Sequence, residues 1–244
     1  SRVIESALLQ FDIPYRVYGG QRFFERLEIK NALAYMRLIL NCHDDVAFER
    51  VVNIPPRGIG ERTVDAVREH ARNISISMWS AAKAMIVDKN LNTRSANALA
   101  AFLNLINEMT NTLEALPLSE LAENSIEMSG LIEMHRREKG ERGQSRVENL
   151  EELIGACKNF SPESIDTPVL AQFLDQVSLE AGERQANEDQ DAVQLMTLHS
   201  AKGLEFPMVI MAGMEENLFP HKMSQNEPGR LEEERRLAYV GITR

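Results

Sequence analysis

The sequence predicts a mainly α-helical chain, in which an all-helical domain is inserted into an incomplete α/β domain. Apolar residues recur at helical spacing through most of the middle of the chain. Short apolar runs bounded by turns, which are typical of buried parallel strands, occur only near the two ends. We therefore expect the two ends to meet in space as one α/β domain, with the helical domain inserted between them.

Residues 1–18 predict a helix followed by a strand. Val3, Ile4 and Ala7 lie at helical spacing, and Pro14 interrupts the pattern. The run Tyr-Arg-Val-Tyr at 15–18 is expected to be extended, and the Gly-Gly pair at 19–20 marks a turn after it.

Residues 21–189 predict a series of helices, separated by segments that are polar or contain glycine or proline. The separators are residues 41–45, 55–60, 139–144 and 161–168. The helices predicted from apolar spacing are residues 29–40, 47–53, 63–72, 78–87, 93–116, 131–139, 146–160 and 169–180.

The character of the sequence changes after the polar stretch 183–191, which is predicted to be a linker. Residues 193–198 predict a strand, and residues 207–212 predict a second, fully buried strand. Residues 231–242 predict a helix, and its acidic start suits the positive end of the helix dipole.

Composition limits the classes of function. The 244 residues are 43 % hydrophobic, and no apolar run is long enough to span a membrane. The net charge of −10 argues against a general nucleic-acid binder, so contact with DNA requires a local basic patch. Cys42 and Cys157 are isolated, which predicts unpaired thiols in a reducing cytoplasm and no metal site.

A first candidate site is the run Ile-Pro-Pro-Arg-Gly-Ile-Gly at 54–60, between two predicted helices. Gly58 and Gly60 allow open backbone angles, and their amide groups, with the N-terminus of the next helix, can bind a phosphate. Arg57 and Arg62 add positive charge on either side. Such contacts go to the DNA backbone and carry no base specificity. The alternative is an ordinary turn between helices, but the flanking arginines favour DNA.

A second candidate site is the stretch 136–146, where five basic and two acidic residues alternate with glycines. Ser145 is predicted to cap the helix that follows, with Glu148 completing a capping box. The stretch is either a solvated charged loop or a second phosphate-contacting patch, on a loop rather than on a helix face.

Polar residues also gather where the predicted strand 193–198 ends. Thr197, His199, Ser200 and Lys202 lie there, and open α/β sheets bind ligands outside the carboxyl ends of their strands. A single histidine in such a turn is usually structural, but a whole run of polar groups favours a ligand site.

The C-terminal helix carries both acidic and basic residues. Glu232 and Arg236 are spaced for an ion pair within an amphipathic helix, which accounts for most of these charges. That reading leaves Arg244, which follows Gly-Ile-Thr, available to bind the phosphate of a nucleotide.

Two stretches resemble motifs V and VI of superfamily 1A DNA helicases of the UvrD/Rep/PcrA type. They are Thr-Leu-His-Ser-Ala-Lys-Gly-Leu-Glu-Phe at 197–206 and Leu-Glu-Glu-Glu-Arg-Arg-Leu-Ala-Tyr-Val-Gly-Ile-Thr-Arg at 231–244. Residues 15–30 resemble the segment after motif IV, and residues 54–60 and 146–153 also look like this family. The resemblance covers essentially the whole chain and implies a piece from the C-terminal half of such a helicase.

The resemblance also implies the domains. Residues 1–18 and 190–244 would be parts of 2A, the second RecA-like domain with a P-loop NTPase-type fold. Residues 19–189 would be the helical 2B domain with a helix-hairpin-helix-like turn. The chain has no Gly-Lys pair of a phosphate loop and no Asp-Glu magnesium motif, so it is expected not to hydrolyse ATP alone.

The family's functional residues transfer position by position. Arg244 matches the arginine that reaches the γ-phosphate of ATP, and Glu205 matches the glutamate near the ribose. Thr197 and His199 match positions near single-stranded DNA. The hairpin that touches duplex DNA matches Gly58, Ile59 and Gly60. The other expected DNA contacts are Arg57, Arg62, Arg142 and Arg146.

The resemblance implies that the parent protein is an ATP-dependent 3′–5′ DNA helicase of mismatch and nucleotide excision repair. ATP and Mg²⁺ would be its cofactors, although neither is expected to bind the isolated chain tightly. DNA junctions and MutL-like and UvrB-like proteins would be its partners, in the bacterial cytoplasm at the nucleoid and not at a membrane.

Two alternatives stay open. The chain could act as a non-catalytic DNA-binding or protein-interaction module with a regulatory role. A helicase-like nuclease subunit of the RecB kind is disfavoured, because the 2B-like and 2A-like parts join without a large insertion.

Overall fold

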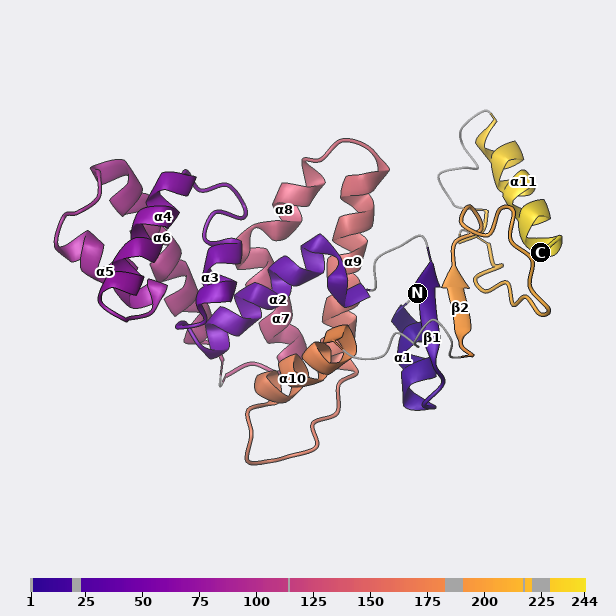
Figure 1. Cartoon of the computed structure of the whole chain (residues 1–244), viewed down its shortest axis with the longest axis horizontal. Coiled ribbons are helices and arrows are strands. Elements are labelled where there is room, and N and C mark those ends of the chain that lie inside the picture. The colour runs from indigo at the N-terminus through magenta and orange to yellow at the C-terminus, as the bar shows by residue number, and fades with distance from the viewer. Residues whose placement is uncertain (1, 19–22, 114, 183–190, 217, 221–228) are drawn as a thin grey trace. The chain divides into compact units, whose positions relative to one another are not determined.

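The computed structural model describes residues 2–18, 23–113, 115–182, 191–216, 218–220 and 229–244, and most of them are helical (Figure 1). The prediction of a mainly α-helical chain is confirmed. The chain divides into two compact units. We call Ser1–Arg22 with Arg184–Arg244 the α/β unit, and Phe23–Glu183 the helical unit. Whether these units correspond to the 2A and 2B domains stays a prediction.

The α/β unit brings the two ends of the chain into one small sheet. Helix α1 (Arg2–Gln10) leads to strand β1 (Tyr15–Tyr18), which pairs in parallel with β2 (Val193–Met196). Tyr15 lies opposite Val193 in this register, and the Val193 N–H donates to Pro14 O at 2.9 Å. Helix α11 (Arg230–Ile242) completes the described elements of this unit.

The predicted second strand at 207–212 is wrong, since these residues form no strand. Met208 and Ile210 are 80 % and 85 % exposed instead of buried. A buried parallel strand needs a hydrogen-bonding neighbour and cover on both faces. Among the residues that the structure describes, the sheet consists of β1 and β2 alone, so neither is supplied.

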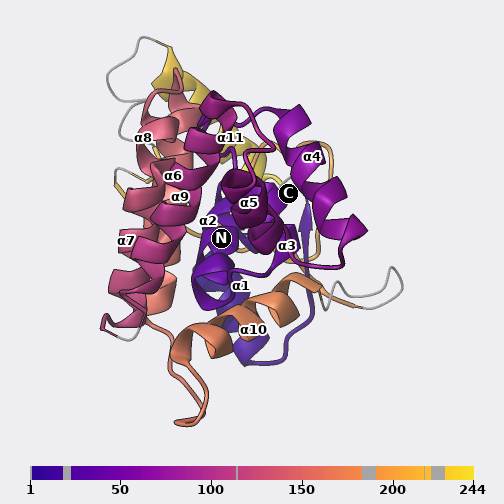
Figure 2. The ribbon, with the colours of Figure 1, turned by 90° about the vertical axis from the view of Figure 1, so that its left-hand side faces the viewer.

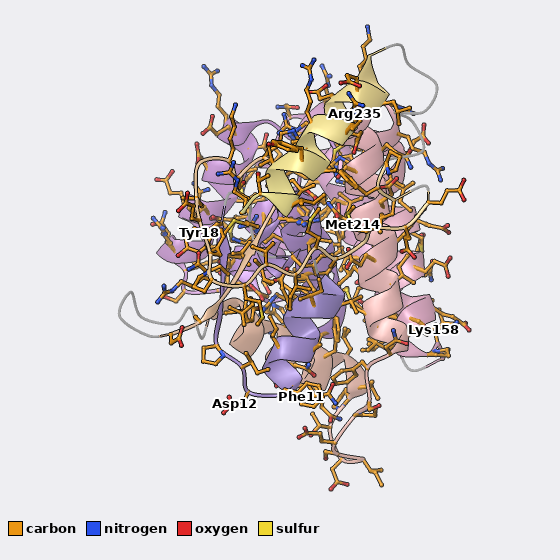
Figure 3. All side chains as sticks on the ribbon, turned by 90° about the vertical axis from the view of Figure 1, so that its right-hand side faces the viewer. Phe11, Asp12, Tyr18, Lys158, Met214 and Arg235 are labelled. Atoms are coloured by element: carbon orange, nitrogen blue, oxygen red, sulfur yellow. The ribbon has the colours of Figure 1, made fainter. Side chains whose placement is uncertain are left out.

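The α/β unit exposes several large apolar side chains. Phe11, Tyr18 and Met214, labelled in Figure 3, are examples.

The helical unit is built around α2 (Leu27–Leu40), which is buried on nearly all sides. Ile29, Tyr35 and Leu38 are completely buried, and other helices surround α2 (Figure 2). The remaining elements are the 3₁₀ helix η1 (Phe23–Glu25), α3 (Asp45–Val51), α4 (Glu61–Asn73), α5 (Met78–Val87), α6 (Thr93–Thr110), α7 (Leu118–Ser129), α8 (Leu131–Arg136), α9 (Glu141–Lys158) and α10 (Val169–Gly182).

Several expectations for this unit need correction. Helix α7 was not predicted, and α6 ends at Thr110 rather than at residue 116. Helix α9 begins at Glu141 with Gly140 as its N-cap, so Ser145 is not the cap and the basic stretch is not one continuous loop. Glycine at 143 lets α9 start here, because a Cβ on Gly143 would lie 2.5 Å from the carbonyl oxygen of His135.

The predicted turn at 19–20 and most of the predicted linker at 183–191 lie outside the described residues. In the part of the chain that the structure describes, every helix is too short or too polar to cross a membrane.

Candidate functional sites

The hairpin between α3 and α4, residues 53–60, is organised by a single asparagine. The Oδ1 atom of Asn53 accepts the N–H of Arg57 at 2.8 Å and the N–H of Ile59 at 3.2 Å. The two prolines at 55 and 56 have no N–H to donate. Few backbone donors therefore remain in this turn.

The remaining backbone N–H donors of the hairpin belong to Gly58 and Gly60, which are exposed. Gly58 has a φ of +80°, a left-handed conformation that strongly favours glycine. Gly60 is the N-cap of α4, at the positive end of the helix dipole. Within the described residues the amides of both glycines make no hydrogen bond, and no atom lies within 4 Å of the Cβ position of either. The turn thus offers open amide groups beside a helix N-terminus.

The side chain of Ile59, between the two glycines, points into the protein. It is 1 % exposed and belongs to the hydrophobic core. Ile59 therefore anchors the hairpin, and only its exposed neighbours can meet a ligand.

Arg57 also turns inward. Its guanidinium donates from Nη1 to Pro55 O at 2.9 Å and from Nη2 to Ser129 O at 2.8 Å. It also lies over the rings of Tyr35 and Phe102, with its Cζ atom 5.7 Å and 5.6 Å from their centroids. Since Ser129 is the last residue of α7, the positive charge lies at the negative end of that helix. Arg57 ties the hairpin to the core.

Tyr35 holds the start of the hairpin. Its hydroxyl donates to Ile54 O at 2.5 Å. Burial raises the pKa of Tyr35 to about 12, while the Arg57 guanidinium acts in the opposite direction. The hydroxyl therefore stays protonated, and remains a donor, at all ordinary pH values.

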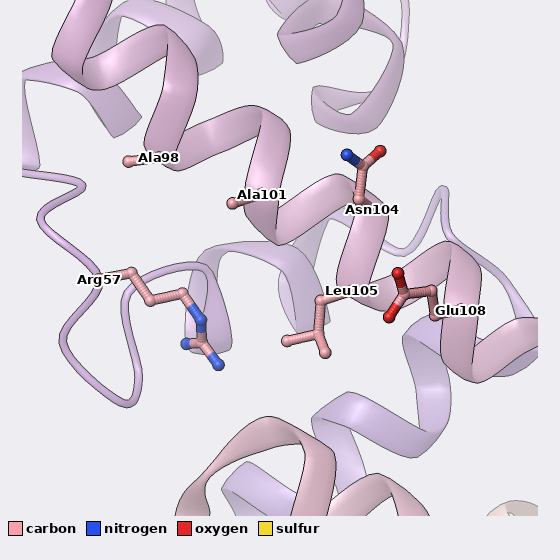
Figure 4. A pocket seen from close by; sticks show the side chains of 6 residues that line it. All are labelled: Arg57, Ala98, Ala101, Asn104, Leu105 and Glu108. Carbon is pink, nitrogen blue, oxygen red and sulfur yellow. The ribbon is translucent and has the colours of Figure 1, made fainter.

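An open groove lies between Arg57 and α6 (Figure 4). Ala98, Ala101 and Leu105 form its apolar part, and Asn104 and Glu108 form its polar end. Arg62, in the first turn of α4, is exposed to solvent.

In the basic stretch, Arg142 is exposed on α9, whereas Arg146 is held in an ion-pair network. Nη1 of Arg146 lies 2.6 Å from Glu138 Oε1, and its Nε lies 3.7 Å from Glu28 Oε2. The buried amide of Asn149 also donates to Glu28, at 2.7 Å. Arg146 therefore joins α9 to α2 and to the turn before α9. Further exposed cations of the stretch are Arg136, Arg137 and Lys139.

In the α/β unit, the polar run begins directly after β2, as predicted. Thr197 Oγ1 lies 2.9 Å from Ser200 Oγ and accepts the Ser200 N–H at 3.2 Å. His199, in the same turn, is exposed. Thr197 thus shapes the turn, and the imidazole of His199 is accessible at the carboxyl end of the strand.

Arg244 connects the end of α11 with the segment after this turn. Its Nη1 donates to Leu204 O at 3.3 Å, its Nε donates to Val240 O at 3.2 Å, and its carbonyl oxygen accepts the Phe206 N–H at 3.2 Å. Glu205, between the two contacted residues, is exposed. The structure thus brings the predicted nucleotide residues Arg244 and Glu205 to one place.

Glycine lets α11 approach this segment closely. A Cβ on Gly241 would lie 2.7 Å from Leu198 and 2.8 Å from Met211. The packing of the helix on Leu198 and Met211 fixes the position from which Arg244 extends.

The roles of Asn53 and Tyr35 were not predicted from the sequence. An asparagine four residues before Arg57 is a signal for a side chain that bonds nearby amides. Tyr35 gave no signal, because it reads as one more apolar position of α2. Over the described residues, no group of three acidic, histidine or cysteine side chains could hold a metal ion.

Comparisons with known proteins find relatives over the whole chain. The whole chain, residues 1–244, matches the UvrD-like helicase C-terminal domain. The chain is 56 % identical over 246 residues to DNA helicase II of Escherichia coli K12, and 41 % identical over 250 residues to the ATP-dependent DNA helicase PcrA of Bacillus subtilis. Both matches cover all of this chain but 34 % of the relative, so the chain spans about a third of their length.

Proposed function

Since the chain belongs to the UvrD-like helicase family through its C-terminal domain, we propose that the longer protein containing it is an ATP-dependent 3′–5′ DNA helicase. It unwinds DNA in mismatch and nucleotide excision repair, in the bacterial cytoplasm at the nucleoid. MutL-like and UvrB-like proteins recruit it there. Hydrolysis of ATP, bound together with Mg²⁺, supplies the free energy for movement along DNA.

The observation that carries this proposal is the contact of Arg244 with the backbone around Glu205. An arginine that approaches the γ-phosphate stabilises the negative charge that develops during phosphoryl transfer. Arg244 would take this role after its guanidinium group releases Leu204 O and Val240 O. The exposed carboxylate of Glu205 would accept a hydrogen bond from the ribose. The phosphate loop and the magnesium ligands would come from the other RecA-like domain of the longer protein.

We assign DNA contacts to both units. In the α/β unit, Thr197 and the exposed His199 contact the single strand at the carboxyl end of β2. In the helical unit, the amides of Gly58 and Gly60 and the side chain of Arg62 contact phosphates of the duplex.

The remaining arginines of the helical unit differ in what they can offer. Arg142 is exposed on α9 and adds a further phosphate contact. Arg57 and Arg146 direct their guanidinium groups to protein acceptors, so they support the DNA-binding surface from inside. Direct phosphate contact by either of them requires those bonds to break first.

A regulatory role for the helical unit is the second candidate. The net charge of −10 for the whole chain disfavours tight DNA binding, and Arg57 and Arg146 direct their guanidinium groups to acceptors within the protein. In this case the unit would act through protein contacts and by limiting access to the duplex.

The test is a chimera in which this chain replaces the matching third of E. coli DNA helicase II. The chimera should hydrolyse ATP in response to DNA and unwind a duplex with a 3′ single-stranded tail but not one with a 5′ tail. Arg244→Ala should lower hydrolysis by about 10³-fold and leave DNA binding unchanged.

Arg235→Ala is the matched control, since Arg235 lies on the same helix with its side chain 78 % exposed. This control should hydrolyse ATP normally. A folded chimera without activity, or full hydrolysis by Arg244→Ala, would contradict the proposal.

A further inference from the structure

One side-chain oxygen determines which amides of the hairpin are used within the protein. Asn53 Oδ1 accepts the N–H groups of Arg57 and Ile59, two alternate positions in the turn. Gly58 and Gly60 each follow one of these two residues in the chain. Both glycines are exposed, and their amides make no hydrogen bond in the described part of the chain. The amides of Arg57 and Ile59 thus have an acceptor within the protein, whereas the amides of Gly58 and Gly60 have none in the described part of the chain.

We infer that Asn53 is a positioning residue for phosphate binding: it binds the amides of Arg57 and Ile59 and thereby presents the amides of Gly58 and Gly60 to a DNA phosphate. This inference rests on the proposed contact between the hairpin and duplex DNA. Two amides two residues apart, next to a helix N-terminus, form a concave donor site that suits one phosphate group.

The rest of the hairpin supports a fixed geometry. Ile59 is buried, the Tyr35 hydroxyl holds Ile54 O at 2.5 Å, and the Arg57 guanidinium holds Ser129 O at 2.8 Å. The turn is therefore ordered before DNA arrives, and the conformational entropy of its backbone is lost on folding rather than on binding. Asn53 is the part of this arrangement that acts directly on the backbone between Arg57 and Ile59.

A positioning role through uncharged amides predicts a particular dependence on salt. Loss of an amide–phosphate hydrogen bond removes no protein cation, so the number of counterions released from DNA stays the same. The affinity should fall by the same factor at each salt concentration. Removing an arginine that contacts a phosphate should instead lower the slope of log K against log salt by about 0.9.

The experiment uses the 244-residue chain and a fluorescent duplex with a single-stranded tail, titrated at several salt concentrations. Hydrogen exchange of the Arg57 and Ile59 amides is measured in parallel. The variants are Asn53→Ala, which removes the acceptor, and Asn53→Asp, which keeps an acceptor oxygen and adds a negative charge.

Ser77→Ala is the matched control. Ser77 is the N-cap of α5 and accepts the Ser80 N–H, so its loss also removes an uncharged side-chain acceptor of backbone amides. It leaves the hairpin intact.

We expect Asn53→Ala to expose both amides to exchange and to weaken binding about tenfold at every salt concentration, because hydrogen bonds to charged groups are worth at least that factor. Asn53→Asp should protect both amides again, and its affinity should approach that of the unsubstituted chain as salt screens the added carboxylate. Ser77→Ala should bind as the unsubstituted chain does.

Three results would overturn the inference. Unchanged affinity in Asn53→Ala, with salt-sensitive binding by the unsubstituted chain, rejects the positioning role and leaves the proposed DNA contact standing. Equal weakening in Ser77→Ala reduces the effect to general stability. Absence of binding by the unsubstituted chain at low salt rejects both the inference and the proposed contact.

Discussion

Replacing Tyr35 with phenylalanine should destabilise the folded chain near neutral pH and stabilise it at strongly alkaline pH. Tyr35 is completely buried, and its hydroxyl donates to Ile54 O at 2.5 Å. Without the hydroxyl this carbonyl loses its donor, which should cost about 1–2 kcal/mol of unfolding free energy near neutral pH.

At high pH the buried hydroxyl of Tyr35 lowers the stability of the folded chain. Burial raises the pKa of Tyr35 to about 12, from 10.0 for an unperturbed tyrosine. Because the pKa of Tyr35 is higher in the folded than in the unfolded chain, its protonated hydroxyl stabilises the fold fully at pH values below the unfolded-state pKa. This stabilisation is lost as the pH rises through the folded-state pKa. A difference of about two pKa units corresponds to about 2.7 kcal/mol, which exceeds the hydrogen bond. The two stability curves should therefore cross at about pH 11.

The assay is urea unfolding between pH 8 and 12, followed by the fluorescence of Trp79, which is buried and is the only tryptophan. Tyr239→Phe, at a side chain that is 69 % exposed, controls for the chemical change and should shift stability by less than about 0.5 kcal/mol at neutral pH. If the difference in stability between Tyr35→Phe and the unsubstituted chain stays constant over the whole pH range, the Tyr35 hydroxyl does not titrate with a raised pKa in the folded chain.

Two further predictions concern α9 and the turn before it. Gly143→Ala should destabilise the chain despite alanine's better helix propensity, because its Cβ would lie 2.5 Å from one backbone oxygen and 2.7 Å from another. Gly155→Ala has open space at its Cβ and should instead stabilise α9 by about 0.5–1 kcal/mol. Thermal unfolding of the pair tests this, and equal shifts would contradict it. Glu138→Gln should lower stability at neutral pH, because the hydrogen bond from His135 lowers the pKa of Glu138 and so stabilises the fold above the unfolded value of 4.5. Unfolding measured from pH 7 downward should show this difference vanish in acid, and a difference that persists there would speak against the bond.

Periodicity in the sequence was sufficient for the helices with a continuous apolar face. Helix α5 has the predicted bounds, and α2 differs by two residues at its start. Helix α7 was missed because its buried face includes Ser125 and Ser129, and polar residues there weaken the apolar stripe on which the prediction depends.

Contacts between distant residues explain what the local sequence did not show. Arg57 was predicted to contact phosphate because glycines follow it; its guanidinium also contacts Ser129, 72 residues away in the chain, and the DNA contact stays a prediction. Gly143 looked like part of a loop, but it is the close-approach residue of a helix whose neighbour is fixed by folding. The segment 207–212 has the composition of a buried strand, and composition alone cannot supply the neighbouring strand.

The candidate sites of the α/β unit were chosen from short motifs, and their function stays a prediction. The turn after β2 and the residue Arg244 were chosen from local sequence, and the structure places Arg244 against Leu204, next to Glu205. The support of the hairpin by Asn53 and Tyr35 depends on tertiary packing and could not be read from the motif alone.

The most direct test of the central claim, that the hairpin binds duplex phosphates through its glycine amides, is an affinity measurement. The unsubstituted chain and the double variant Gly58→Ala/Gly60→Ala are titrated with a tailed fluorescent duplex at low and moderate salt. We expect salt-sensitive binding by the unsubstituted chain. We expect binding at least about tenfold weaker in the variant, because alanine is strained at the φ of +80° of residue 58. Equal binding by the two proteins, or none by either at low salt, would contradict the central claim.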